Sequence, residues 1–337
     1  MSFSPPCCPI PQCPSSTKGT PFLWRKRGHY VRACDGRAVQ RFLCLACLTS
    51  FSVQSFRLDF RHRKPHLNGL IFDLFISKVT HRQAARILRT RRRTIERRLP
   101  LYGEHGRLFQ QARLKGKRIE GVYLLDELET FEQNRRLKPV TMPLLIERES
   151  RFFVHLETAA LPARGPLSAK NQLKKEELER LQGKRRSGST AAVTRCFEAL
   201  ARHHKEGKPA LILTDCKTSY PVILSAVFKK QAPTHLQTSS KRKRDPKNPL
   251  FAINHSFAML RDGISRLVRR TWAHSMKRER LAQHAWIHLL WRNFVRGVTN
   301  VKHRITPAMA IGIETEAWTR RGLLVWSARF PQLLKVQ

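Results

Sequence analysis

The placement of cysteines constrains this chain more than any other feature of its sequence. Six of the eight cysteines lie in the first 47 residues, and four of them form two close pairs, Cys8 with Cys13 and Cys44 with Cys47. Two such pairs, separated by a stretch rich in basic and aromatic residues, can meet at one tetrahedral Zn²⁺. A domain this small buries little apolar surface, so the metal would supply much of its stability.

We therefore predict a zinc ribbon over residues 1–60, with Cys8, Cys13, Cys44 and Cys47 as ligands of a structural Zn²⁺. Four thiolates leave no open position for catalysis. Cys7 is an alternative to Cys8, and Cys34 is a spare thiol. The competing interpretation is a set of free thiols without metal. Cys196 and Cys216 stand alone and are expected to be small core residues.

The net charge points to a polyanionic partner. Lysine and arginine number 65 against 24 aspartate and glutamate, a formal charge of +41. An excess of this size repels itself in a compact state, and nucleic acid offsets it with release of counterions. An apolar run long enough to span a membrane and a signal-peptide pattern are both missing from the sequence. We expect a cytoplasmic, nucleoid-associated protein that binds double-stranded DNA and no membrane.

Residues 65–118 are predicted to form a helix-turn-helix domain. Thr80 is a plausible N-cap for the helix that begins at His81, and Ile95 and Leu99 are expected to point inward from the helix that follows. The exposed face of that recognition helix would carry the DNA-binding arginines Arg91, Arg92, Arg93, Arg97 and Arg98. The competing interpretation is an ordinary helical hairpin with a solvated basic face.

From Val122 onward the pattern is strands followed by helices. Three strands, a helix, a strand, a helix and a strand predict an α/β fold with a mixed sheet flanked by helices. The charged segment near residues 165–190 is either an exposed helix or a flexible insert. The basic loop at residues 239–249 is interpreted as a DNA clamp, with a solvated loop as the alternative; its cations are Lys241, Arg242, Lys243 and Arg244.

Acidic residues are scarce, so two at strand ends are informative. Asp126 closes the apolar run that begins at Val122, and Asp215 closes the run that begins at Ala210. Carboxylates on adjacent strands can share divalent metal, and Mg²⁺ prefers such ligands. Strand-end aspartates also cap helices and form turns, which is the competing explanation.

Four segments together resemble the bacterial insertion-sequence transposases of the DDE type. RFLCLACLTSFS is similar to the second knuckle of their N-terminal zinc ribbons. LLDELETF and LTDCKTSYP resemble the segments that carry their first and second catalytic acids. The stretch from LFAINHSFAMLRDG to LLWRNF resembles the C-terminal helical segment that carries the third. The resemblance covers nearly the whole chain in the expected order.

This resemblance implies a ribonuclease H-like fold over residues 119–310, with residues 311–337 as a C-terminal tail. It implies Mg²⁺ or Mn²⁺ as cofactor, the terminal repeats of a mobile element as substrate, and is compatible with a homodimer. It makes Asp126 and Asp215 the metal ligands and puts Asn254 at the third position, where most of the family has glutamate. Asp262 is the nearest acid that could substitute. Either Glu127 or Glu129 could point toward the site, and the alternative is that both face solvent.

Three functions remain open on this basis. The first is a transposase that binds element ends and performs metal-dependent cleavage and transfer of DNA strands. The second, motivated by Asn254, is a catalytically inactive, transposase-derived DNA-binding protein. The third is a nuclease that acts on RNA–DNA hybrids. Trp286 and Trp291 are candidates for base stacking, but core packing is the favoured interpretation for both.

Overall fold

The computed structural model describes residues 3–17, 21–205, 207, 209–229, 232–268, 272–299, 305–328 and 330. The chain divides into two compact units, which are treated separately. The first combines Met1–Ile71 with Trp318–Gln337, and the second is Phe72–Ala317. This division differs from the predicted one in two respects. C-terminal residues join the cysteine-rich unit, and residues 72–118 belong to the same unit as the sheet.

The first unit is built on a small antiparallel sheet in the order β1-β2-β3. Its strands are β1 (Trp24–Val31), β2 (Ala38–Cys44) and β3 (Ser50–Ser52), and its helices are η1 (Pro14–Ser16), η2 (Val53–Phe56), η3 (Pro65–Leu67) and α10 (Arg320–Val325). Phe42 of β2 stacks on Phe51 of β3, and Phe56 packs edge-on against Phe330, with ring centroids 4.6 Å apart. This aromatic cluster and four buried cysteines make up the core of the unit.

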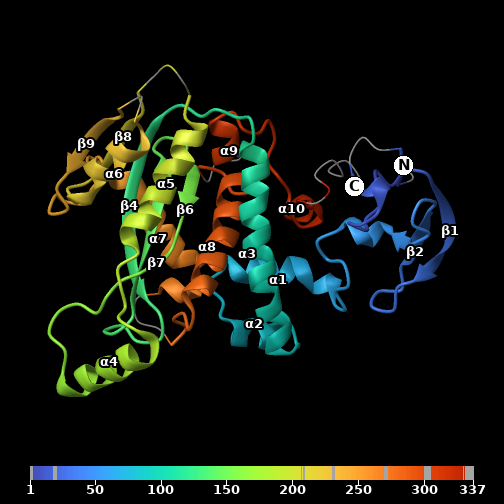
Figure 1. The fold of residues 1–337 in the computed structure, drawn as a ribbon, viewed down its shortest axis with the longest axis horizontal. Helices are drawn as coiled ribbons and strands as arrows, with labels where there is room; N and C mark the ends of the chain where they lie inside the picture. Colours follow the sequence, from blue (N-terminus) through green and yellow to red (C-terminus); the bar gives the residue numbers. More distant parts are fainter. Residues whose placement is uncertain are drawn as a thin grey trace. The chain divides into compact units, whose positions relative to one another are not determined.

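The second unit is a mixed sheet covered by helices (Figure 1). Its strands are β4 (Val122–Phe131), β5 (Pro139–Glu147), β6 (Phe153–Leu156), β7 (Ala159–Ala160), β8 (Leu211–Asp215) and β9 (Thr234–Thr238). Its helices are α2 (His81–Ile87), α3 (Arg92–Leu114), α4 (Ala169–Gln182), α5 (Ser189–His203), α6 (Ser219–Val227), α7 (Phe251–Gly263), η4 (Ser265–Leu267), α8 (Arg278–Phe294) and α9 (Pro307–Ala310). Helix α1 (Asn68–Phe75) spans the boundary between the two units.

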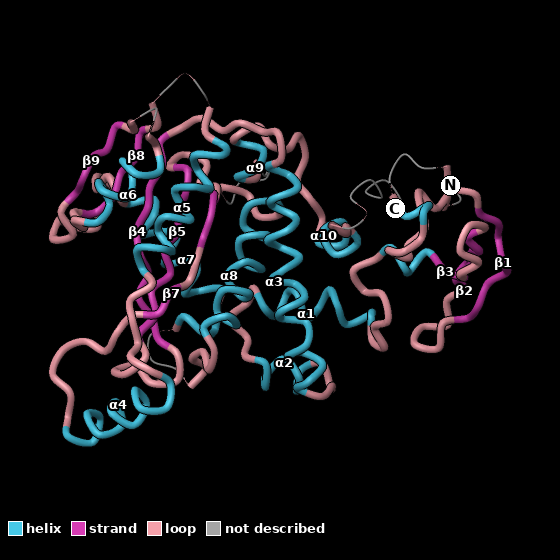
Figure 2. The backbone as a smooth tube through the Cα atoms, in the orientation of Figure 1, coloured by secondary structure: helices cyan, strands magenta, loops and turns pink. Residues whose placement is uncertain are grey.

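The sheet has the order β6-β5-β4-β8-β9, with β7 paired to β5. β4, β5 and β6 are antiparallel neighbours, whereas β8 runs parallel to β4, and β9 runs parallel to β8. The tube in Figure 2 follows these strands through the centre of the unit, with helices on both sides. The predicted mixed sheet flanked by helices is therefore confirmed, and its strand order is compatible with a ribonuclease H-like fold.

Side chains of β4 alternate between the two faces of the sheet, as strand geometry requires. Leu124 and Leu128 pack in the main core with Phe257 of α7 and Leu289 of α8. The odd-numbered side chains face α5 and α6, since Glu127 receives a hydrogen bond from Ser189 at the start of α5. This alternation sends Asp126 and Glu127 to opposite faces.

Helix α3 packs closely along α8 (Figure 1) because small residues line the contact. A Cβ at Gly103 would lie 2.6 Å from the Cα of Gln283, and one at Gly106 would lie 2.8 Å from the carbonyl oxygen of Trp286. Two buried amides join this helix pair to the edge strand β6. Asn293 donates to Gln110, at 2.7 Å, and accepts from the backbone N–H of Phe153, at 2.9 Å. Buried backbone groups at the sheet edge are thereby satisfied.

The segment before α3 agrees in part with the sequence-based expectation. Thr80 caps α2: its hydroxyl accepts from the N–H of Gln83, and the side-chain Oε1 of Gln83 accepts from the N–H of Thr80. Helix α3, however, continues through Pro100 for 23 residues. The expected recognition helix and the helix that packs on α8 are therefore one element.

The charged segment before α5 forms an exposed helix, the first of the two predicted alternatives. Helix α4 begins at the N-cap Ser168 and has no buried residue. Figure 1 shows it apart from the helices that cover the sheet. None of the helices in the part of the chain that the structure describes has the length and apolar character needed to cross a membrane.

Candidate active site

Parallel pairing of β4 with β8 brings the two predicted acids to the same level. Leu124 pairs with Leu213. Two residues further along each strand, Asp126 and Asp215 fall opposite each other and on the same face as the two leucines, because side-chain direction repeats every second residue. Asp215 ends β8, but β4 continues to Phe131, so the expectation that the first strand stops near Asp126 is wrong.

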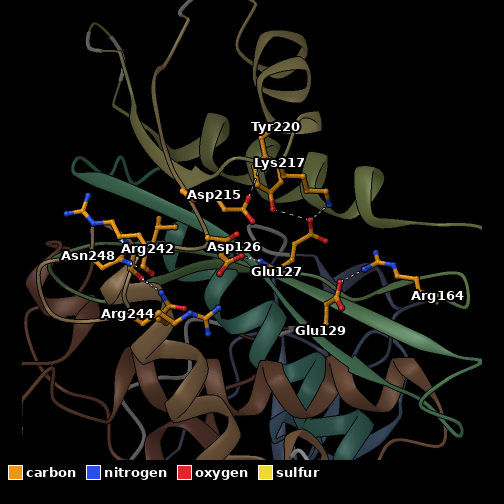
Figure 3. A pocket seen from close by; sticks show the side chains of 14 residues that line it. Asp126, Glu127, Glu129, Arg164, Asp215, Lys217, Tyr220, Arg242, Arg244 and Asn248 are labelled. Carbon is orange, nitrogen blue, oxygen red and sulfur yellow. Dashed lines mark hydrogen bonds and ion pairs between the residues drawn. The ribbon is translucent and has the colours of Figure 1, made fainter. Parts of the chain in front are cut away.

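The two aspartates open into a pocket of about 360 Å³ (Figure 3). Asn254, from the start of α7, lines it as well, so the structure brings all three predicted residues together. The other lining residues are Glu127, Glu129, Arg164, Lys217, Tyr220, Ser239, Ser240, Arg242, Arg244, Asn248 and Leu250. Sequence reasoning missed Arg164, Lys217, Tyr220 and Asn248, although Lys217 and Tyr220 lie within the segment that carries Asp215.

Asp126 is in an environment that disfavours its negative charge. Burial raises its pKa to about 6, and the charges of Asp215 and Glu127 add to the rise. The backbone N–H of Glu127, 2.7 Å from Oδ1, and the charge of Arg244 act in the opposite direction. Neither Asp126 nor Asp215 forms an ion pair with any residue that the structure describes. A cation between them would relieve this repulsion.

Asn254 is held by its own helix. Its side-chain Nδ2 donates to the carbonyl oxygen of Leu250, 3.0 Å away. With the amide nitrogen engaged, Oδ1 is the atom left to act as an acceptor in the pocket. Two carboxylates and one amide oxygen are ligands that suit Mg²⁺ or Mn²⁺, so the residues present fit a divalent ion.

Asp262, the acid considered as a substitute for Asn254, does not fulfil that role. It lines a different pocket, and its carboxylate lies 3.7 Å from the ammonium of Lys78. Two helical turns separate it from Asn254, and its side chain is 86% exposed.

The basic loop between β9 and α7 is ordered by Asn248. The amide of this buried residue donates to the carbonyl oxygen of Lys243 at 2.7 Å and accepts from the N–H of Leu250 at 2.8 Å. Arg242 and Arg244 line the pocket, whereas Lys241 and Lys243 are exposed and lie outside its lining. The loop therefore brings two of the four predicted cations to the carboxylates.

The four predicted zinc ligands converge in the first unit. The Sγ atoms of Cys8, Cys13, Cys44 and Cys47 all lie within 4.8 Å of one another. Two of the separations are 3.7 Å, from Cys8 to Cys47 and from Cys13 to Cys44. Tetrahedral Zn²⁺ with Zn–S bonds of about 2.3 Å spaces its thiolates roughly 3.8 Å apart. The donor set fits a metal such as zinc.

The remaining cysteines divide between two environments. Cys7 and Cys34 are not in the four-cysteine group of the described residues. Cys196 is fully buried, as predicted, and its thiol lies near the carbonyl oxygen of Pro143. Cys216 is exposed, so its assignment as a core residue is wrong. It occupies the turn that leaves the sheet after Asp215.

The arginines at the start of α3 differ in exposure. Arg91, Arg92, Arg93 and Arg97 are exposed, and Arg92 pairs with Glu96 at 2.9 Å. Arg98 is only 8% exposed, so its expected place on the open face of the helix is wrong. Arg98 follows Ile95 by three residues and therefore lies on the inward face of α3. Trp286 is buried at 7% exposure, which agrees with core packing.

Comparison with known proteins adds little. No protein-family model and no curated protein matches the chain. Among solved structures, the catalytic domain of Mos1 mariner transposase is similar over 58% of this chain and 86% of that domain, with 13% sequence identity and a TM-score of 0.26. A TM-score of this size does not establish a common fold.

Proposed function

We propose that this protein is a DDE-type transposase that binds double-stranded DNA and catalyses metal-dependent cleavage and transfer of DNA strands. One observation carries the proposal. Asp126 and Asp215 lie on adjacent parallel strands, face the same side of the sheet, and share a pocket with Asn254 and three arginines. An open acidic site with cationic walls suits a phosphodiester substrate.

The sheet supports the same class. Three antiparallel strands followed by two parallel ones, in the order β6-β5-β4-β8-β9, are compatible with a ribonuclease H-like core. In this arrangement the first acid comes from the central strand β4 and the second from its parallel neighbour β8. The third ligand, Asn254, comes from a helix late in the chain.

In this proposal Asp126, Asp215 and Asn254 hold Mg²⁺ or Mn²⁺. The bound metal would activate an attacking oxygen and stabilise the leaving one during in-line displacement at phosphorus. Arg242 and Arg244 bind the phosphates on either side of the scissile bond and draw the DNA backbone toward the carboxylates. No covalent protein–DNA intermediate is required.

The cysteine cluster serves as a structural Zn²⁺ site in the same proposal. Its four thiols leave no ligand position for substrate. The hydroxyl of Thr49 lowers the pKa of Cys47 to about 6, which favours the thiolate form that binds metal. A zinc ribbon of this kind would contribute to recognition of element ends.

The exposed arginines of α3 are the proposed contacts of a helix-turn-helix with DNA. Arg91, Arg92, Arg93 and Arg97 suit phosphates and guanine edges, whereas the buried Arg98 is removed from this set. The net charge of +41 agrees with a large electrostatic share of the affinity.

The test is cleavage of a duplex that contains the ends of the element, with and without Mg²⁺. We expect metal-dependent nicking by the wild type and a loss on the order of 10²-fold or more in Asp126→Asn and in Asp215→Asn, as for removal of a group that stabilises the transition state. Asp262→Asn is the matched control, because Asp262 lies outside the pocket. Equal nicking by all four proteins would contradict the proposal.

The alternative is a transposase-derived DNA-binding protein that no longer cuts. Asn254 favours it, because a neutral amide oxygen binds a divalent ion more weakly than a carboxylate does. DNA binding that falls steeply with salt, together with no nicking in Mg²⁺ or Mn²⁺, would support this alternative. An RNA–DNA hybrid substrate is tested by competition in the same assay.

A further inference from the structure

Glu127 follows Asp126 directly but serves the other face of the sheet. Asp126 shares the side of Leu124 and Leu128, whereas Glu127 points toward the starts of α5 and α6. Figure 3 shows its carboxylate turned away from that of Asp126 and toward Lys217 and Tyr220. Two consecutive acids on β4 therefore line the same pocket, but their side chains point to opposite faces of the sheet.

The carboxylate of Glu127 is saturated by donors. Its Oε2 accepts from the hydroxyls of Thr141 and Ser189, each at 2.7 Å. Its Oε1 accepts from the ammonium of Lys217 and from the hydroxyl of Tyr220, the latter at 3.1 Å. With two donors on each oxygen, Glu127 has no free lone pair with which to bind a metal.

The charge on Glu127 is maintained in this buried position. Burial raises the pKa of the carboxyl group, but hydrogen bonds from Lys217, Thr141 and Ser189 outweigh burial and bring the pKa below its usual value. The side chain is 10% exposed, whereas that of Lys217 is 38% exposed. The pair thus joins a fixed carboxylate on β4 to a lysine on the turn after β8.

Lys217 is held at both ends. Its ammonium contacts Glu127, donates to Ser189 at 2.8 Å and lies 5.4 Å from the ring centre of Tyr220. Its backbone N–H donates to Oδ1 of Asp215 at 3.2 Å. A continuous path therefore runs from β4, through the side chain of Lys217, to the carboxylate of the second acid.

We propose that Glu127 is a positioning residue that, through Lys217, fixes the turn after β8 and with it the Asp215 carboxylate. The inference rests on the proposed function, because it concerns the metal that Asp126 and Asp215 would share. Residues that orient metal ligands affect metal affinity strongly, whereas their loss leaves the ligands themselves in place. Glu127 acts on the affinity of the site and does not contact the ion.

The experiment measures Mn²⁺ binding to the full chain by electron paramagnetic resonance, with zinc retained, beside the Mg²⁺ dependence of nicking. We expect Glu127→Gln and Lys217→Met to weaken Mn²⁺ binding by about 10- to 100-fold. The nicking rate at saturating Mg²⁺ should stay within a few-fold of wild type. Lys217→Arg, which keeps a cation for Glu127, should recover most of the affinity, which a purely structural role would not predict.

Glu132→Gln is the matched control. Glu132 directly follows β4, and its carboxylate pairs with Arg185 at 2.8 Å, with the side chains 13% and 23% exposed, but neither residue lines the pocket. We expect no change in Mn²⁺ affinity for this variant. Thermal unfolding of each variant shows whether it is folded under the assay conditions.

The outcomes separate this inference from the proposed function. If wild type binds Mn²⁺ and loses it in Asp126→Asn, the metal site stands. Unchanged affinity in both Glu127→Gln and Lys217→Met would then overturn the inference alone, as would failure of Lys217→Arg to recover binding. If wild type does not bind Mn²⁺ at all, the proposed function fails and the inference fails with it.

Discussion

The cysteine cluster and the aspartate pocket are both built to fit a cation, yet they differ in how complete they are. In the cluster, four ligand atoms lie within 4.8 Å of one another and aromatic side chains surround them. In the pocket, two carboxylates and an amide meet an open volume of about 360 Å³ with arginines in its lining. A complete ligand set stabilises a fold, and an incomplete one leaves room for a substrate.

Removing one of the four clustered cysteines should have the largest effect, because it should destabilise the fold of the first unit. Cys44→Ser is expected to abolish zinc binding and to unfold residues 21–56, since structural zinc contributes on the order of 10 kcal/mol to a small domain. Zinc content and hydrogen exchange measured along the full chain test this. Cys34→Ser is the control, because Cys34 is not among the four clustered cysteines. If the variant binds no zinc but its amide hydrogens exchange as slowly as those of wild type, the cysteine cluster does not stabilise the fold, and the contrast with the pocket is lost.

Changing Asn254 should affect chemistry but not folding. Asn254→Ala removes one pocket acceptor and is expected to slow nicking on the order of 10²-fold, as for loss of a transition-state ligand. Asn254→Asp restores an oxygen ligand and should retain activity. The single-turnover rate at saturating Mg²⁺ is the measurement. If Asn254→Ala nicks as fast as wild type, the pocket works with the two aspartates alone.

The pH dependence of the free energy of unfolding should show that the negative charge on Asp126 is unfavourable in the folded chain. The pKa of Asp126 is about 6 in the folded chain against 3.8 for an unperturbed carboxyl group, so the folded state binds more protons between these values. Stability from this group is present below pH 4 and is lost as the pH rises through 6. At about 1.4 kcal/mol per unit, the loss approaches 2–3 kcal/mol at pH 8.

Asp126→Asn removes this dependence, so the variant should be more stable than wild type at pH 8 in the absence of divalent metal and nearly equal to it at pH 4. Urea unfolding at both pH values is the measurement, and the difference between the two proteins cancels the contribution of other titrating groups. A wild type that gains stability relative to Asp126→Asn as the pH rises would contradict the assigned direction.

Replacing single arginines on the two faces of α3 should give the smallest effects, with one variant affecting DNA binding and the other affecting stability. Arg97→Ala is expected to lower the slope of log affinity for DNA against log salt by about 1, because one phosphate contact is lost. Arg98→Ala should leave that slope unchanged and destabilise the fold by about 1–3 kcal/mol, because Arg98 is buried. Fluorescence anisotropy at several salt concentrations, with urea unfolding, distinguishes the two. Identical slopes in wild type and Arg97→Ala would contradict the recognition-helix proposal.

The sequence predicted best what depends on short-range pattern. The spacing of Cys8, Cys13, Cys44 and Cys47 implies a four-ligand site because each pair is local and needs only one chain reversal to meet the other. Asp126 and Asp215 were found because each ends an apolar run, and parallel strands place such residues side by side.

Features that depend on tertiary contacts were not predictable from the pattern. Arg98 has the same residue type as its neighbours, and only the packing of the inward face of α3 explains its burial. The proposed role of Glu127 depends on contacts with Thr141, Ser189 and Lys217, which come from three other segments of the chain. Cys216 is exposed because the chain turns directly after β8, a boundary that its composition does not reveal.

The cysteine-rich unit contains residues from both ends of the sequence. Phe330 packs edge-on against Phe56, and Leu323 and Trp326, which belong to the same unit, are buried. During translation this core lacks part of its aromatic surface until Phe330 has been made, whereas the sheet from Val122 to Thr238 is made earlier. We therefore expect this sheet to be available for folding before the core of the cysteine-rich unit is complete.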